Sequence, residues 1–169
     1  MEVKDDFLTM NMYISILCMD KVIKIGNNFL KENKGLNKIF MPNALIVGDG
    51  FISKNNSINE LVMDNLIYAG NYFLQCNVYL LELYFSKLRC VGNWFVSANK
   101  IINKVEFSEL EKAGDNFLAS NNMLLELSFL YLEKVGNNFL FRNRCLYYNN
   151  SLMKCMQIVW NLLVIIFYI

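Results

Sequence analysis

The apolar positions of this chain recur at one fixed interval over most of its length. Phenylalanines return every 22 residues, and the glycine three residues before each of them keeps the same interval. A constant period in the twenties is typical of a solenoid, in which each repeat is one coil that buries its apolar side only against neighbouring coils. The residues that set this period are Gly26, Gly48, Gly70, Gly92, Gly114 and Gly136, with Phe29, Phe51, Phe73, Phe95, Phe117 and Phe139.

Within each repeat, a short segment alternates between apolar and polar residues with a period of two. Leu83-Tyr84-Phe85 and Val105-Glu106-Phe107 are two examples. This alternation predicts a short β-strand in every coil. Because the coils stack, we expect these strands to lie side by side, about 4.8 Å apart, in a parallel sheet.

An asparagine or aspartate follows every one of the six glycines. Both residue types are favoured helix N-caps, so the pattern predicts a turn of α-helix or 3₁₀-helix after the glycine. The glycine itself permits a positive φ or a close backbone approach at this corner. The expected fold class is therefore an α/β solenoid: a right-handed coil with a parallel sheet on its concave face and short helical turns on its convex face.

A second polar residue, asparagine, also keeps the 22-residue interval. An inward asparagine is costly unless its amide is fully hydrogen-bonded. Two structural roles fit: a ladder of amides between coils, or support for a left-handed turn. We expect a structural role for this column rather than a ligand-binding one. Its members are Asn33, Asn55, Asn77, Asn99, Asn121 and Asn143, with Asn11 upstream.

The residue order F-L-x-x-N-x-x-L-x-x-L-x-F-x-x-L-x-x-V-G resembles the leucine-rich repeats of the BspA-like type, found in bacterial and protozoan surface proteins. The resemblance extends from Val3 to about Lys154. It implies a horseshoe or gently curved solenoid that binds proteins, often on a cell surface, and it implies no reaction. The departures are the period of 22, asparagine where the family often has cysteine, and a strand-flanking proline only at Pro42. The motif residues are Phe117, Leu118, Asn121, Leu124, Leu127, Phe129, Val135 and Gly136.

The composition narrows the classes of function. Sixteen basic and fifteen acidic residues give a net charge of +1, which argues against a nucleic-acid binder or an anionic-membrane binder. Histidine is absent, which removes the usual general base and the commonest metal ligand. The glycines are spaced too widely for a phosphate-binding loop. We therefore expect a non-enzymatic protein without a metal or cofactor.

The cysteines indicate no metal site and no disulfide framework. They form no CxxC pair, and their number is odd. We expect reduced cysteines that take the place of small apolar residues, since a free cysteine packs as a small hydrophobe. They are Cys18, Cys76, Cys90, Cys145 and Cys155.

The carboxyl end departs from the repeat. The register is lost after Leu146, so the sequence divides into an array over 1–155 and an apolar tail over 156–169. The tail is shorter than the roughly 20 residues that a membrane-spanning helix needs, and a membrane anchor is the weaker interpretation. We hypothesise a frameshift at Cys155, because rereading a back-translated tail in another frame restores the motif. The DNA around that codon tests the hypothesis.

The two ends of the array carry two further expectations. The amino terminus lacks the basic and apolar regions of a secretory signal, which indicates a cytoplasmic start, although the family resembled is often surface-exposed. Neither end of the array shows a recognisable cap, so self-association through open sheet edges is expected.

The outward columns of the predicted strands form the candidate binding surface. Exposed aromatic and aliphatic side chains beside charges suit a protein-binding face, with Tyr84 as an anchor. The acidic residues are interpreted as a solvated ladder with lysines rather than as a catalytic pair. The alternative to protein recognition is a structural or frameshifted fragment of a larger surface protein. The candidate residues are Phe40, Glu60, Val62, Glu82, Tyr84, Lys104, Glu106 and Glu126.

Overall fold

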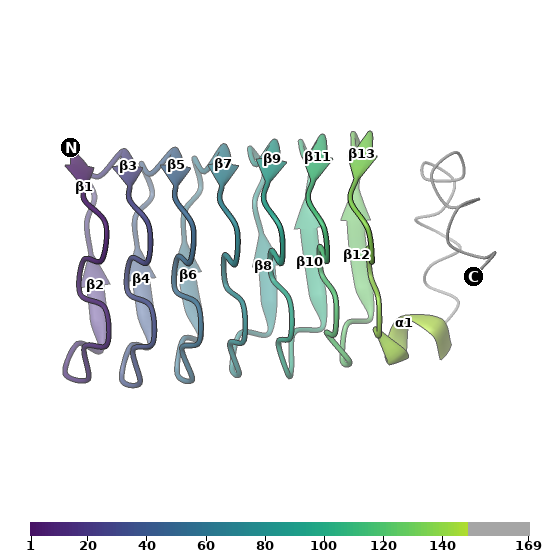
Figure 1. Ribbon diagram of the computed structural model, residues 1–169, viewed down its shortest axis with the longest axis horizontal. Coiled ribbons are helices and arrows are strands. Elements are labelled where there is room, and N and C mark those ends of the chain that lie inside the picture. Colours follow the sequence, from purple (N-terminus) through teal and green to yellow (C-terminus); the bar gives the residue numbers. More distant parts are fainter. Residues whose placement is uncertain (149–169) are drawn as a thin grey trace.

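The computed structural model describes residues 1–148 as a parallel β-solenoid whose coils lie side by side along its long axis (Figure 1). Each coil contributes two short strands on different faces. One face is a continuous seven-stranded sheet, and its paired residues are separated by the predicted 22 positions. Its strands are β1 (Glu2–Val3), β3 (Lys24–Ile25), β5 (Ile46–Val47), β7 (Tyr68–Ala69), β9 (Cys90–Val91), β11 (Lys112–Ala113) and β13 (Lys134–Val135).

The second face holds the strands that the alternating pattern predicts. It consists of two three-stranded parallel sheets, because β6 and β8 are not paired with each other. We call it the split face. Its first sheet is β2 (Ile16–Cys18), β4 (Lys38–Phe40) and β6 (Glu60–Val62), and its second is β8 (Glu82–Tyr84), β10 (Lys104–Phe107) and β12 (Glu126–Phe129).

A change in one core column coincides with the split. Behind the first sheet this column holds Met41 and Met63, and behind the second it holds Phe85, Phe107 and Phe129. A methionine adapts to irregular space, whereas a ring requires a defined position. The Phe85 ring lies edge-on to Phe73, with 5.8 Å between centroids. The bulk and fixed geometry of these rings give a physical reason for the strands in front of them to break away from β6.

The predicted core phenylalanines form a stack along the solenoid axis. Consecutive rings are stacked, with centroid separations from 4.9 Å for Phe73 and Phe95, which are nearly parallel, to 5.8 Å for Phe95 and Phe117, whose planes are inclined by 30°. Stacked pairs contribute about 1 kcal/mol each beyond the burial of their area. The stack therefore links every coil to the next through the middle of the molecule.

The prediction of helical turns on the convex side is wrong. The segment after each glycine is a series of turns in which every second residue has a positive φ, as at Asn28, Leu30 and Glu32. Their amides point along the solenoid axis: Asn28 donates to Asp49 O (2.6 Å) and Leu30 to Phe7 O (3.0 Å). These N–H groups therefore bond to carbonyl groups of neighbouring coils and not to carbonyl groups of a helix in their own coil. Within residues 1–148 the only helix is α1 (Arg144–Tyr148).

The asparagine or aspartate after each glycine is a rung between coils and not an N-cap. Asn27 Oδ1 accepts the backbone N–H of Asp49 at 2.8 Å, and Asp49 Oδ1 accepts that of Asn71 at 2.8 Å. We call this series the surface ladder. It explains the glycine column: a Cβ at Gly92 would lie 2.6 Å from the Asn71 nitrogen and 2.7 Å from its Oδ1. Close approach, and not a positive φ, is what requires glycine there.

The inward asparagines form a buried ladder, which is one of the two roles predicted for them. Asn121 is fully buried, its Nδ2 donates to Val96 O (2.7 Å) and Leu118 O (2.8 Å), and its Oδ1 accepts the Asn99 N–H (2.9 Å). The amides of Asn33, Asn55 and Asn77 also donate to backbone carbonyls of the preceding coil, but their Oδ1 atoms accept no hydrogen bond among the described residues. The ladder is thus closed only in the second half of the array.

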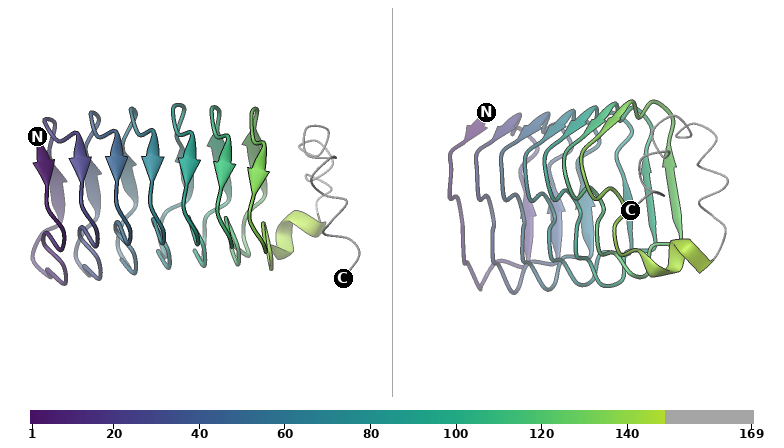
Figure 2. Two further views of the ribbon diagram at one scale, coloured as in Figure 1. Left: turned by 45° about the horizontal axis from the view of Figure 1, so that its top comes forward. Right: turned by 45° about the vertical axis from the view of Figure 1, so that its right-hand side comes forward.

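The coils stack in a nearly straight row, as Figures 1 and 2 show. A concave face arises when one side of a coil is wider than the other, as when helices about 10 Å apart lie behind strands about 4.8 Å apart. Here extended backbone and hydrogen-bonded turns on all sides repeat at the spacing of strands. The physical cause of curvature is therefore missing from residues 1–148.

The boundary at residue 155, the apolar tail 156–169 and the frameshift hypothesis lie outside the described residues.

Replacing Asn121 by alanine should lower the free energy of unfolding by about 3 kcal/mol, because it removes the acceptor of the buried Asn99 N–H and the amide donor to the Val96 carbonyl. Urea denaturation followed by circular dichroism measures the change. The matched control is Asn122→Ala, which changes an exposed asparagine. Equal effects of the two substitutions would contradict the buried ladder.

Ala98→Gly should stabilise the protein by about 1 kcal/mol, against the usual effect of glycine, because exposed Ala98 has φ +56°. Buried Ala119 has no positive φ, and Ala119→Gly should destabilise the protein by about 1 kcal/mol. Thermal melts of both variants test this opposition of sign. A loss of stability in Ala98→Gly would argue against the left-handed turns.

Candidate functional site

The structure places all eight predicted binding residues on the outside of the split face, where each is at least partly exposed. Cross-strand pairing brings Phe40 beside Val62, and Glu106 beside Tyr84. Lys104 lies between Glu82 and Glu126. The split separates the eight residues into two groups, with the larger group on β8, β10 and β12.

Tyr84 is the centre of the larger group. Its side chain is half exposed, and its hydroxyl donates a 2.6 Å hydrogen bond to Glu82 Oε2. Lys104 Nζ lies 5.9 Å from the centre of the Tyr84 ring and 3.2 Å from Glu126 Oε2. One aromatic ring, one ammonium and two carboxylates are thereby held together on adjacent strands.

These contacts raise the pKa of two groups. The pKa of Tyr84 is raised first by the hydrogen bond to Glu82, then by slight desolvation and nearby carboxylates, while Lys104 opposes the shift. The pKa of Lys104 is raised first by its hydrogen bond to Glu126 and also by Tyr84. The Tyr84 hydroxyl and the Lys104 ammonium are therefore both protonated at neutral pH, and they act as hydrogen-bond donors to the carboxylates of the cluster.

The smaller group is Phe40, Glu60 and Val62, and its glutamate forms an ion pair with Lys38 of the same sheet. Lys38 Nζ lies 2.7 Å from Glu60 Oε2, and both side chains are about 40% exposed. An exposed pair of this kind contributes well under 1 kcal/mol. Glu60 and Glu82 thus have their own partners on separate sheets, as expected for a solvated ladder.

The cysteines of the described residues are all free: Cys18 is exposed, and Cys76, Cys90 and Cys145 are half-buried. Desolvation raises the pKa of the Cys76 thiol, with a smaller opposing effect of Lys54. Over residues 1–148, no three cysteine, aspartate or glutamate side chains gather closely enough to hold a metal ion. No helix of that part is long and apolar enough to cross a bilayer.

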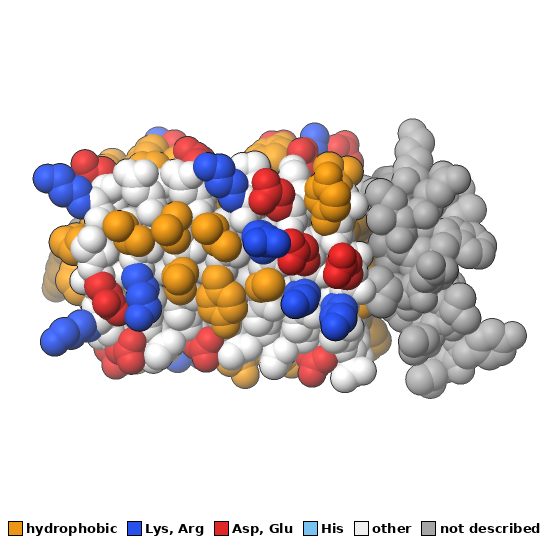
Figure 3. Space-filling view, turned by 90° about the horizontal axis from the view of Figure 1, so that it is seen from above, with side chains coloured by type: hydrophobic (Ala, Val, Ile, Leu, Met, Phe, Trp, Pro, Cys, Tyr) orange, Lys and Arg blue, Asp and Glu red, His pale blue; other side chains and the backbone are white. Residues whose placement is uncertain are grey.

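Sequence reasoning missed the outer surface of the seven-stranded sheet. Six apolar side chains lie together there and are flanked by charges, as Figure 3 shows. We call them the apolar patch. The strands of this sheet have two residues each, which is too short to show an alternation of apolar and polar residues. Aligning the sequence at its 22-residue period would have placed these apolar residues in adjacent columns. The patch consists of Ile23, Leu45, Ile46, Ile67, Tyr68 and Cys90.

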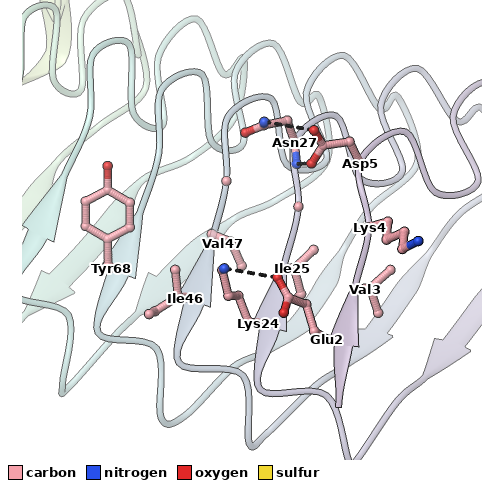
Figure 4. Close-up of a pocket in the computed structure, with 12 residues that line it drawn as sticks. Glu2, Val3, Lys4, Asp5, Lys24, Ile25, Asn27, Ile46, Val47 and Tyr68 are labelled. Atoms are coloured by element: carbon pink, nitrogen blue, oxygen red, sulfur yellow. Dashed lines mark hydrogen bonds and ion pairs between the residues drawn. The ribbon is translucent and has the colours of Figure 1, made fainter.

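A shallow depression of about 640 Å³ borders the patch (Figure 4). Ile46 and Tyr68 lie along one side of it, and the surface ladder from Asp5 to Asn27 lies along the other. Glu2 and Lys24 form an ion pair of 3.0 Å at one end. The absence of side chains in the glycine column is what leaves this space.

Glu82→Gln should lower the pKa of Tyr84 toward its usual value, because the charged acceptor that stabilises the protonated phenol is removed. The titration of Tyr84 is followed by phenolate absorbance, as the difference between each protein and its Tyr84→Phe derivative. Glu60→Gln, on the other sheet, should leave the midpoint unchanged. Equal midpoints in the parent protein and Glu82→Gln would refute the hydrogen bond.

No family model, no curated protein and no solved structure matches this chain. What the structure itself establishes is a parallel β-solenoid of 22-residue coils with buried asparagines. The likeness to BspA-like repeats therefore rests on the motif residues alone.

Proposed function

We propose that this chain is a non-catalytic repeat module of the BspA-like type that recognises a protein partner through the split face. The observation that carries the proposal is the cluster of Tyr84, Glu82, Lys104 and Glu126, in which an exposed ring is held by hydrogen bonds and charges on adjacent strands. A tyrosine whose orientation is already fixed loses little conformational freedom when it is buried by a partner.

The charges of this cluster favour a partner with basic side chains. The second sheet presents three carboxylates, Glu82, Glu106 and Glu126, against one ammonium, Lys104. An arginine of the partner could stack on the Tyr84 ring and reach a carboxylate, a pairing common at energetically important positions of interfaces. Phe40 and Val62 on the first sheet would extend the contact with apolar area.

A second candidate function is a structural segment of a longer repeat protein. It is favoured by the uniform stacking, in which β1 and β13 are the outermost strands of the seven-stranded sheet over residues 1–148. Edge strands offer unpaired backbone groups to a further coil. In this function the split face would have no partner of its own.

The proposed function is tested with the double variant Glu82→Lys/Tyr84→Ala. If the split face binds a protein partner, the variant should bind that partner at least 10-fold more weakly than the parent protein does, as measured by the amount captured in a pull-down. An anchor residue contributes about 2 kcal/mol or more to binding. The matched control is Tyr79→Ala, which removes an exposed tyrosine of the same coil outside the split face. Partner binding that is unchanged in the double variant would favour the structural function instead.

A further inference from the structure

The outer surface of the seven-stranded sheet is built from two adjacent rows of side chains. The residues of the first row, row A, are joined from coil to coil by backbone hydrogen bonds, such as Leu45 N–H to Ile23 O (2.8 Å) and Ile67 N–H to Leu45 O (2.9 Å). Row B follows from the strand pairing. Row A is Ile23, Leu45, Ile67, Arg89, Glu111 and Glu133, and row B is Lys24, Ile46, Tyr68, Cys90, Lys112 and Lys134.

The apolar patch occupies the part of both rows that lies nearer the amino terminus. Ile23, Ile46, Ile67 and Tyr68 each expose between 40% and 48% of their surface. Large contiguous apolar surfaces usually mark an interaction site in soluble proteins. The flat sheet beneath the patch suits packing against a second sheet about 10 Å away.

The charged parts of the two rows have opposite signs in the last two coils. Glu111 in row A lies next to Lys112 in row B, and Glu133 lies next to Lys134. Arg89 forms an ion pair with Glu111. Within residues 1–148, Lys112, Glu133 and Lys134 make no ion pair.

We propose that this sheet is the interface of a homodimer, in which a second copy of the chain packs face to face about a two-fold axis parallel to the solenoid axis. Such an axis sets row A of one copy opposite row B of the other at the same coil. Leu45 then packs on Ile46 of the second copy, and Ile67 packs on Tyr68 of the second copy.

The charges identify the second copy as the occupant. In this arrangement Glu111 faces Lys112 of the second copy, and Glu133 faces Lys134 of the second copy. Along the two rows, from Ile23 and Lys24 to Glu133 and Lys134, no charged residue faces one of like charge. Lys112, Glu133 and Lys134, which make no ion pair within residues 1–148, each gain a partner of opposite charge. Turning one copy end for end over the patch would instead carry Glu133 and Lys134 beyond the other sheet. The split face lies on a different side of each solenoid and stays free, so the dimer does not depend on the function proposed above.

Sedimentation velocity of the full chain, from about 1 to 100 µM, tests the dimer. We expect a closed monomer–dimer equilibrium with a Kd on the order of 10 µM, since the contact lies at the small end of specific interfaces. Ile46→Glu/Ile67→Glu should weaken it at least 10-fold, because it buries carboxylates against Leu45 and Tyr68 of the second copy without a partner of opposite charge. Tyr84→Ala, on the split face, should leave the Kd unchanged. Circular dichroism confirms that each variant is folded.

A charge reversal distinguishes self-pairing from other association. Glu133→Lys and Lys134→Glu should each raise the Kd several-fold, because each sets like charges opposite one another. The double reversal Glu133→Lys/Lys134→Glu should restore it, since opposite charges then face each other again. A monomer throughout the range would overturn the proposal. So would open-ended oligomers that are indifferent to all these substitutions, as expected for association through sheet edges.

Discussion

Hydrogen bonding between successive coils at a constant 22-residue offset is the constraint on which the rest of the structure depends. A coil of this solenoid satisfies few of its backbone groups internally, because its turns direct their amides along the axis toward neighbouring coils. The amides that point along the axis must therefore find equivalent acceptors in a neighbouring coil at every repeat. A single insertion within a coil would displace all of these partners together, which is why the period is uniform from β1 to β13.

Two side-chain ladders reinforce this offset from opposite sides of the turn. In the surface ladder, Asn27 and Asp49 hold the backbone of the following coil. In the buried ladder, the Asn121 side chain binds the preceding coil, and the Asn121 N–H donates to Asn143 Oδ1 of the following coil. Between the ladders, buried Leu30 and Ile52 adopt positive φ, which is unfavourable for a side chain branched at Cβ such as that of isoleucine. These conformations persist because the hydrogen bonds and ring stacking around them determine the backbone on every side.

The same regularity produces two surfaces with different properties. Strand positions on the split face alternate charges with aromatic and aliphatic residues, which suits selective recognition of another protein. Positions on the seven-stranded sheet separate apolar residues from charged ones along the axis, and the charged part is complementary to itself. The columns are set by the fold, whereas the residues that fill them are free to vary, because an exposed side chain is not needed for the stacking of coils.

The sequence by itself determined the period, the strands that include Tyr84 and Glu106, the column of core phenylalanines and the column of inward asparagines. Each of these follows from residues that recur at one interval, and burial leaves them few alternatives. Only the tertiary structure decided whether Asn27 is an N-cap or a rung of the surface ladder. Both roles require a side-chain oxygen that accepts a backbone N–H, and they differ in whether that N–H belongs to the same coil or to the following one. The same holds for the split between β6 and β8, which coincides with the change from Met63 to Phe85 in the core and with the edge-on packing of Phe85 on Phe73. It also holds for the apolar patch, since Ile23 and Tyr68 become neighbours only when separate coils are stacked.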